Sequence, residues 1–402
     1  MALNKAVGIF FIVVSCFPWV GIPSFDTQPF PFLIAIIYIS IEFLAQKTYL
    51  LVPRFILLSS ALISAGLLIS LSLENSFDFL AIRGSIMYLG IPIYIFAFTF
   101  FIKKYGFPLS TFYYCNIVWI AAALLQLILP DLFLTVVSSR TTGDRGLTSL
   151  APEPTFFGIY LFFSSWILAA RDGYRPSKKS KIFIILNIIS IMVLAMSSMA
   201  IIFVFLAGIT MYACNPTRVP RRYMITLLII FISTFAFLNS ALESSRLYSI
   251  LTIIFTNPEL LFTTDASSNS RLSSIIIPIH SFFKDYLIPH GFYAYPSVSE
   301  EIAANYGDFF FYEYSKDKID SWLGSILFEL GIFGFIGIIV IFHGLRGCSK
   351  KPIIESLFLF VILLSAIPVA FPLVYLLISI LRLGANTNAN IKLTQSRCGM
   401  LN

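Results

Sequence analysis

Long apolar runs separated by short polar segments follow one another along almost the whole chain. A run of about 17 to 25 apolar residues can cross a bilayer as a helix, so the pattern predicts an all-α polytopic membrane protein with eleven or twelve transmembrane helices. Pro368 and Pro372 interrupt the last run, which is therefore one bent helix or two segments. Only Ser197–Met199 divides the seventh run from the eighth, which predicts a tight helical hairpin. The runs lie near 6–22, 29–45, 55–73, 86–102, 112–130, 155–170, 182–198, 199–213, 223–239, 321–342 and 353–381.

The charged residues divide unequally between alternate loops. With a cytoplasmic N-terminus, the inner loops hold 16 of the 27 Lys and Arg residues, the outer loops hold 8, and the C-terminal tail holds the rest. Cytoplasmic loops of membrane proteins carry an excess of Lys and Arg, so we predict this orientation. A twelfth span would keep the basic tail inside. The net charge of +7 is therefore a topology signal and does not indicate a nucleic-acid partner.

Composition supports the same class. The chain is 58% hydrophobic and 12% charged, whereas a soluble domain has about 25% charged residues. The five cysteines and three histidines are scattered, so neither a disulfide framework nor a metal site is predicted, and no cofactor is expected. We treat residues 1–402 as a single integral membrane domain.

Two polar segments on the outer side interrupt the apolar pattern: 131–154 and 240–320. The first places two arginines and a glutamate next to a predicted span, where charge is costly unless it is solvated, paired or bound to a ligand. The second contains an apolar stretch at 271–287, which is too short to span and is expected to be a helix at the membrane interface. A turn at Ile288–Gly291 is predicted to end this helix. The two loops together form the candidate active site.

Three stretches carry a resemblance to a known family. RGLTSLAPEPTFFG (145–158) resembles the central signature of the O-antigen and capsule polymerase family, the Wzy type, which is related to the O-antigen ligases. SRLSSIIIPIHSFFKDYLIPHGF (270–292) is similar to the family's arginine-opened helix in the long outer loop. DSWLGSILFELGIFGF (320–335) matches the Glu-x-Gly pattern at Glu329–Gly331, but it has Asp320-Ser321 where the family has His-Asn. The missing histidine favours a polymerase over a ligase and leaves the general base uncertain.

The resemblance implies a metal-independent glycosyltransferase of the bacterial inner membrane, with a large periplasmic loop containing short helices. Such an enzyme transfers a growing glycan from polyprenyl pyrophosphate onto a lipid-linked oligosaccharide repeat unit at the outer face of the membrane. The implied partners are the lipid-linked oligosaccharide, the bilayer and a chain-length regulator. Two alternatives remain open: an O-antigen ligase acting on lipid A core, and a non-enzymatic transporter of lipid-linked oligosaccharides.

Arginine suits a pyrophosphate ligand, because its planar guanidinium stays charged and donates several hydrogen bonds at once. Arg145 and Arg271 are therefore the candidates for stabilising the leaving group, and Arg140 is a candidate for substrate binding. The structural alternative for each single arginine is an ion pair or a contact with lipid headgroups.

A carboxylate or imidazole has to accept the proton of the acceptor hydroxyl. Glu153, Asp320 and His290 are the candidates, in that order. Glu153 suits a helix-capping role equally well, because Pro154 follows it and favours the first turn of a helix. His290 is more often a residue that stabilises a turn.

The second polar segment is rich in tyrosine and phenylalanine. Tyr293, Tyr295 and Tyr312 are candidates for stacking on sugar rings. The structural alternative for each ring, an aromatic interface belt or a loop core, is favoured over sugar contact.

Overall fold

The computed structural model describes residues 2–21, 27–46, 52–73, 79–130, 146–214, 252–253, 256–257, 260–311, 318–345 and 351–384. Within these ranges the chain forms helices and no strand, which confirms the all-α prediction. The predicted span at 223–239 lies outside the described residues. So do Arg140, Arg145 and Tyr312.

A helix occupies most of each predicted apolar run in the first half of the chain, although α1 ends at Ser15, before the predicted end of the first run at 22. They are α1 (Ala2–Ser15), α2 (Phe30–Gln46), α3 (Arg54–Ser72), α4 (Phe79–Tyr105) and α5 (Leu109–Ile128). The second half adds α7 (Pro154–Arg171), α8 (Lys178–Ser190), a π-helical turn η1 (Ile191–Ala195), α9 (Ser198–Cys214), α12 (Leu261–Thr264), α13 (Ala266–Lys284), α14 (Tyr295–Ala304), a 3₁₀ turn η3 (Gly307–Phe309), α15 (Trp322–Gly344), α16 (Lys351–Leu363) and a final helix, Pro372–Gly384.

Four of the described helices are long and apolar enough to cross a membrane: Arg54–Ser72, Ala81–Tyr105, Leu109–Ile128 and Trp322–Gly344. Several shorter apolar helices accompany them. This length and composition indicate a membrane protein. The total of eleven or twelve spans and the cytoplasmic N-terminus remain predictions.

Two predicted interruptions occur where expected. The chain breaks at Met196, a non-glycine residue with φ of 44°, between the π-helical turn and α9. The predicted tight hairpin is not formed, because α9 packs against α7 instead of back along α8. The last apolar run consists of two helices, because the helical segments at Lys351–Leu363 and Pro372–Gly384 are separated by turns. Of the two possibilities for this run, the structure has two segments.

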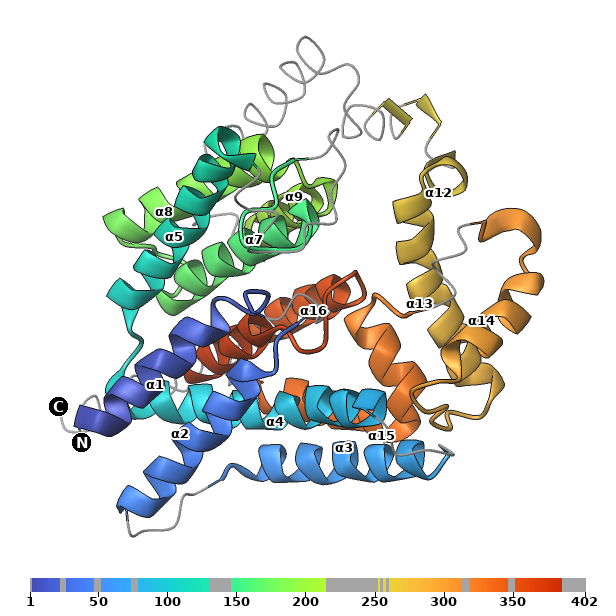
Figure 1. Ribbon diagram of the computed structural model, residues 1–402, viewed down its shortest axis with the longest axis horizontal. Helices are drawn as coiled ribbons and strands as arrows, with labels where there is room; N and C mark the ends of the chain where they lie inside the picture. The colour runs from blue at the N-terminus through green and yellow to red at the C-terminus, as the bar shows by residue number, and fades with distance from the viewer. Residues whose placement is uncertain are drawn as a thin grey trace, which may run out of the picture.

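Small residues bring α3 and α15 close together. Gly66 faces Leu330, Gly337 faces Ile63, and the ring of Phe55 packs on Gly344. The order of these contacts shows that the two helices are antiparallel. Small residues at such an interface allow the backbones to approach, as is typical of helices packed within a membrane. Figure 1 shows α3 alongside α4 and α15, with α13 packed beside α15 and α14 packed on α13.

Candidate functional site

The segment that begins at Gly146 is fixed against the π-helical turn. The backbone N–H of Leu147 donates to the carbonyl of Leu194 at 2.8 Å. A Cβ atom at Gly146 would collide with the carbonyl oxygen of Ala195. Only glycine allows so close a backbone approach. This explains why a glycine follows Arg145 in the Arg-Gly pair.

The side chain of Gln126, in the last turn of α5, holds the next two residues. Its Oε1 accepts hydrogen bonds from the backbone N–H groups of Thr148 (3.1 Å) and Ser149 (2.8 Å), and its Nε2 donates to Thr148 Oγ1 at 2.9 Å. Ser149 has φ of 52° and donates through Oγ to the carbonyl of Trp119 at 2.7 Å. Sequence analysis missed Gln126. The sequence feature that could have indicated Gln126 is a polar amide side chain near the end of an apolar run.

Glu153 is the N-cap residue of α7, as its position before Pro154 suggested. Its backbone is extended, and Pro154 occupies the first turn of the helix. The carboxylate makes no capping hydrogen bond, so its position close to the helix N-terminus is not explained by capping geometry. A carboxylate at this end of a helix is nevertheless stabilised by the helix dipole.

Arg271 links α13 to the start of α7. Its Nη2 donates to Thr155 Oγ1 at 3.4 Å, although the two residues are 116 positions apart. Thr155 lies two residues after Glu153 and is in the first turn of α7. The contact therefore joins the second polar segment to the residue that directly follows the first, within the stretch 145–158 that carries the family resemblance. Whether Arg145 also converges on Arg271 stays a prediction.

Asp320 lies beside the same face of α13. Its backbone N–H donates to Ser274 Oγ at 3.2 Å, and Ser274 follows Arg271 by three residues, about one helical turn. Its carboxylate is 3.3 Å from Lys318 Nζ. The next residue, Ser321, caps α15 by accepting a hydrogen bond from the N–H of Gly324 at 3.0 Å. The start of α15 is therefore anchored one turn from Arg271.

The aromatic candidates differ in their surroundings. Tyr295 is only 3% exposed and packs edge-on against Phe328, with ring centroids 5.3 Å apart. Burial raises the pKa of Tyr295, and the nearby Asp320 carboxylate raises it further. A ring buried in this way offers no open face to a sugar, so the geometry favours the loop-core alternative for Tyr295. Tyr293 is half-buried, and its proposed sugar contact stays a prediction.

His290 stabilises the turn after α13. Its Nε2 lies 2.8 Å from Ser281 Oγ and 2.9 Å from Asp285 Oδ2, and its ring stacks on Phe328 at 4.5 Å. In a Ser-His-Asp relay the hydroxyl and the carboxylate contact opposite ring nitrogens, whereas here both contact the same nitrogen. The arrangement favours the turn-stabilising alternative for His290 over the role of general base.

The turn that contains His290 is bonded into a break in α15. Gly331 has φ of 54° and ψ of −141°, which interrupts the helix. The N–H of Ile332 donates to the carbonyl of Leu287 at 2.8 Å, and the N–H of His290 donates to the carbonyl of Phe328 at 3.0 Å. Backbone groups freed by the break are thus satisfied by the turn, as a break within an apolar helix requires.

Glu329 lies beside this break. Tyr88 of α4 donates from its hydroxyl to Glu329 Oε2 at 2.6 Å, and Ser70 of α3 donates to the Glu329 carbonyl. These bonds tie the middle of α15 to two neighbouring helices. They favour a structural role for Glu329, because they fix the helix that carries Asp320 just before its first turn.

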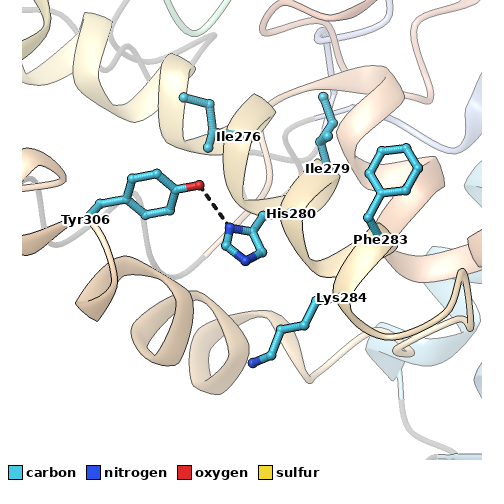
Figure 2. A pocket seen from close by; sticks show the side chains of 6 residues that line it. All are labelled: Ile276, Ile279, His280, Phe283, Lys284 and Tyr306. Carbon is cyan, nitrogen blue, oxygen red and sulfur yellow. Dashed lines mark hydrogen bonds between the residues drawn. The ribbon is translucent and has the colours of Figure 1, made fainter.

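A separate hollow lies between α13 and the end of α14. Its volume is about 610 Å³, and Figure 2 shows the hydrogen bond of 2.9 Å between His280 Nδ1 and the Tyr306 hydroxyl across it. At about 100° per residue, Ile276 and His280 lie on the side of α13 away from Arg271. The hollow therefore does not include the Arg271 contact. The residues that line it are Ile276, Ile279, His280, Phe283, Lys284 and Tyr306.

The site thus consists of a guanidinium, the N-terminus of α7 with its carboxylate, and a second carboxylate anchored one turn along α13. Within the described residues, no three His, Cys, Asp or Glu side chains are grouped so that they could hold a metal ion. No protein-family model matches the chain, and no curated protein has significant sequence similarity to it.

Proposed function

We propose that this protein is a polysaccharide polymerase of the Wzy type. In this proposal it transfers a growing glycan from polyprenyl pyrophosphate to a lipid-linked repeat unit at the outer face of a bacterial inner membrane. The contact between Arg271 and Thr155 is the observation that supports this best, because it joins the stretches 145–158 and 270–292, which both carry the family resemblance. A guanidinium beside a helix N-terminus is a favourable place for phosphate oxygens.

The proposed reaction is a single substitution at the anomeric carbon of the donor glycan. A hydroxyl oxygen of the acceptor forms a bond to this carbon, and the bond from the carbon to the pyrophosphate oxygen breaks. The electron pair leaves with polyprenyl pyrophosphate, whose increasing negative charge Arg271 would stabilise, together with Arg145 as the second candidate. Fixed donors aimed at such a charge give large rate effects. The acceptor proton passes to a carboxylate.

Glu153 is the first candidate for this base and Asp320 is the second. Glu153 carries a carboxylate with no capping bond at the start of α7, two residues from the threonine that Arg271 contacts. Asp320 is placed second because its carboxylate is already in an ion pair with Lys318.

We expect Glu153→Gln to lower the rate of transfer roughly a hundredfold or more, the range for a lost general base. Because glutamine has the same shape and the carboxylate makes no capping hydrogen bond, the melting temperature should remain close to that of the wild type. Transfer rates and thermal unfolding of the purified variant are the two measurements. Glu301→Gln on α14 is the control for loss of one acidic side chain. A Glu153→Gln enzyme with a normal rate would move the role to Asp320.

The polymerase reaction itself is tested with purified protein in lipid vesicles. A lipid-linked repeat unit from the producing strain is supplied as both donor and acceptor, lipid A core is added as a competing acceptor, and the products are separated on a gel. A ladder of products one repeat unit apart is expected. Single transfers onto lipid A core, without a ladder, would instead identify a ligase.

The transporter alternative has one observation in its favour. The break at Gly331 and the carboxylate of Glu329 both lie within a helix long enough to span, and broken helices with polar groups are typical of transporters. In the vesicle assay, a transporter would move the lipid-linked unit between leaflets and form no product longer than the substrate. The same experiment therefore separates all three functions.

A further inference from the structure

Arg382 presents a guanidinium that has no acceptor in the described part of the chain. It lies in the final helix, Pro372–Gly384, and its Cζ atom is 4.0 Å from the centre of the Phe55 ring. Its Nη1 atom is buried and makes no hydrogen bond to any described residue, whereas the side chain as a whole is only half-buried and its Nε and Nη2 atoms are not enclosed. An arginine side chain carries five N–H donors, and desolvated donors without acceptors are unfavourable. The ring of Phe55 stabilises the cation through the face of the guanidinium, but it cannot accept the hydrogen bonds that the N–H groups donate in the guanidinium plane.

Three helix ends meet around this group. Phe55 is in the first turn of α3, and its ring packs on Gly344 in the last turn of α15. The first turn of α3 contains no acidic residue, and Pro53 gives it no side-chain cap. Asp320 and Arg271 are near the other end of α15, which has 23 residues and is therefore about 35 Å long. Arg382 is thus distant from the proposed glycosyl-transfer site.

The chain supplies little negative charge near this point. The segments 43–73, 330–354 and 356–402 contain no aspartate or glutamate, and Glu355, which lies between the last two, has an interaction of its own. α3 and α4 are antiparallel, so the end of α4 lies beside the start of α3. Glu42 contacts this end of α4, where its carboxylate already accepts hydrogen bonds from Lys104 (2.6 Å) and Tyr105 (2.7 Å). The basic residues of the three segments are Lys47, Arg54, Arg346, Lys350, Lys351, Arg382, Lys392 and Arg397.

We propose that Arg382 binds the phosphate group of an anionic phospholipid at the end of the bundle opposite to Arg271. A guanidinium matches two phosphate oxygens with parallel hydrogen bonds, and basic residues at helix ends attract anionic headgroups. Leu57 and Leu58, beside Phe55 on α3, are more than half exposed and give acyl chains an apolar surface next to the headgroup. This combination favours a lipid phosphate over free phosphate. The proposal does not depend on the glycosyltransferase function.

The test measures lipid retained by the purified full-length protein. The protein in mild detergent is incubated with phosphatidylglycerol or phosphatidylcholine, and bound lipid is counted by native mass spectrometry. The wild type should retain phosphatidylglycerol in preference to phosphatidylcholine. Arg382→Gln should reduce that preference roughly fivefold or more, the factor for one basic residue at a membrane surface. Arg171→Gln is the matched control, because Arg171 is already paired with Asp172 at 2.7 Å.

Each outcome decides the proposal. Equal retention of phosphatidylglycerol by Arg382→Gln and the wild type would overturn it. Displacement of the lipid by millimolar inorganic phosphate would assign the site to free phosphate and would overturn the lipid assignment. If Arg382→Gln does not fold, Arg382→Lys replaces it. Lysine keeps the charge but not the fork, so weaker retention than in the wild type supports the proposal, and unchanged retention contradicts it.

Discussion

Arg271→Ala should abolish polymer formation while the protein still folds and inserts. Arg271 is half-buried, and one of its contacts, the hydrogen bond to Thr155 Oγ1, is long at 3.4 Å, so the loss of this bond has a small effect on stability. The loss of a cation that stabilises the leaving pyrophosphate is far larger. Removing a single donor of this kind lowers rates about 10²- to 10³-fold. Product ladders and initial rates from the purified variant in vesicles measure this effect.

Two further variants separate charge from geometry. Arg271→Lys keeps the positive charge but cannot form two parallel bonds to phosphate, so it should recover only a small part of the activity. Lys284→Ala removes a cation from the same helix at a surface ion pair with Glu301, where the partners are 39% and 66% exposed. Exposed pairs of this kind contribute about 0–1 kcal/mol, so this control should keep the wild-type ladder. Polymer of normal length from Arg271→Ala would contradict the proposed function.

The contact that supports this prediction could not be derived from the sequence. The hydrophobic pattern predicted α7 and the helix at 271–287, because each is a local property of consecutive residues. Their meeting at Thr155 and Arg271 depends on how α13 packs on the bundle, and no local pattern specifies that packing. The family resemblance grouped the two segments, and the structure supplies the contact between them.

The errors and omissions of the sequence analysis have similar physical causes. The seventh run was predicted as α-helix to its end, but the α-helix changes to a π-helical segment at Ile191. The carbonyl of Leu194 in this segment accepts the hydrogen bond from Leu147. The hydrogen bonds that Gln126 makes to Thr148 and Ser149 were missed, because a single amide in an apolar run does not show which backbone groups it will bind. The break within α15 was also missed, although Gly331 stood in a pattern that the resemblance had singled out.

For Tyr295 and His290, by contrast, the role that the structure favours was among the predicted alternatives. For both residues, sequence analysis weighed a ligand-binding role against a structural one, and both residues contact Phe328 in the folded chain. Phe328 is fully buried in the half of α15 that precedes the break. A residue's type indicates what it can bind, but its neighbours decide whether its polar groups and ring faces are open to a ligand.

Gly331→Ala should be the most damaging substitution in the apolar part of the chain. Residues other than glycine are strained at φ of 54° when combined with ψ of −141°, at a cost of about 1–3 kcal/mol. A Cβ atom would also lie 2.6 Å from the Leu287 oxygen and 2.6 Å from the Pro289 nitrogen, which are backbone atoms of the turn after α13. The turn would have to move and would lose its backbone bonds to α15, each worth roughly 0.5–1.5 kcal/mol.

We therefore expect Gly331→Ala to lower the free energy of unfolding by about 3 kcal/mol or more, measured by denaturation of the purified protein in detergent. Gly337→Ala is the matched control on the same helix. Its Cβ would come close only to the side chain of Ile63, at 3.2 Å, and would lie at ordinary contact distances of 3.6 Å from the Ser59 carbonyl oxygen and 3.7 Å from Leu62 Cβ, so it should cost less than about 1.5 kcal/mol. Since the turn at Leu287–His290 ends the segment that begins with α13, moving it should also displace Arg271. Any Gly331→Ala protein that still folds should consequently make less polymer than Gly337→Ala. Equal stability and equal polymer from the two variants would show that the turn does not position α13 through the break in α15.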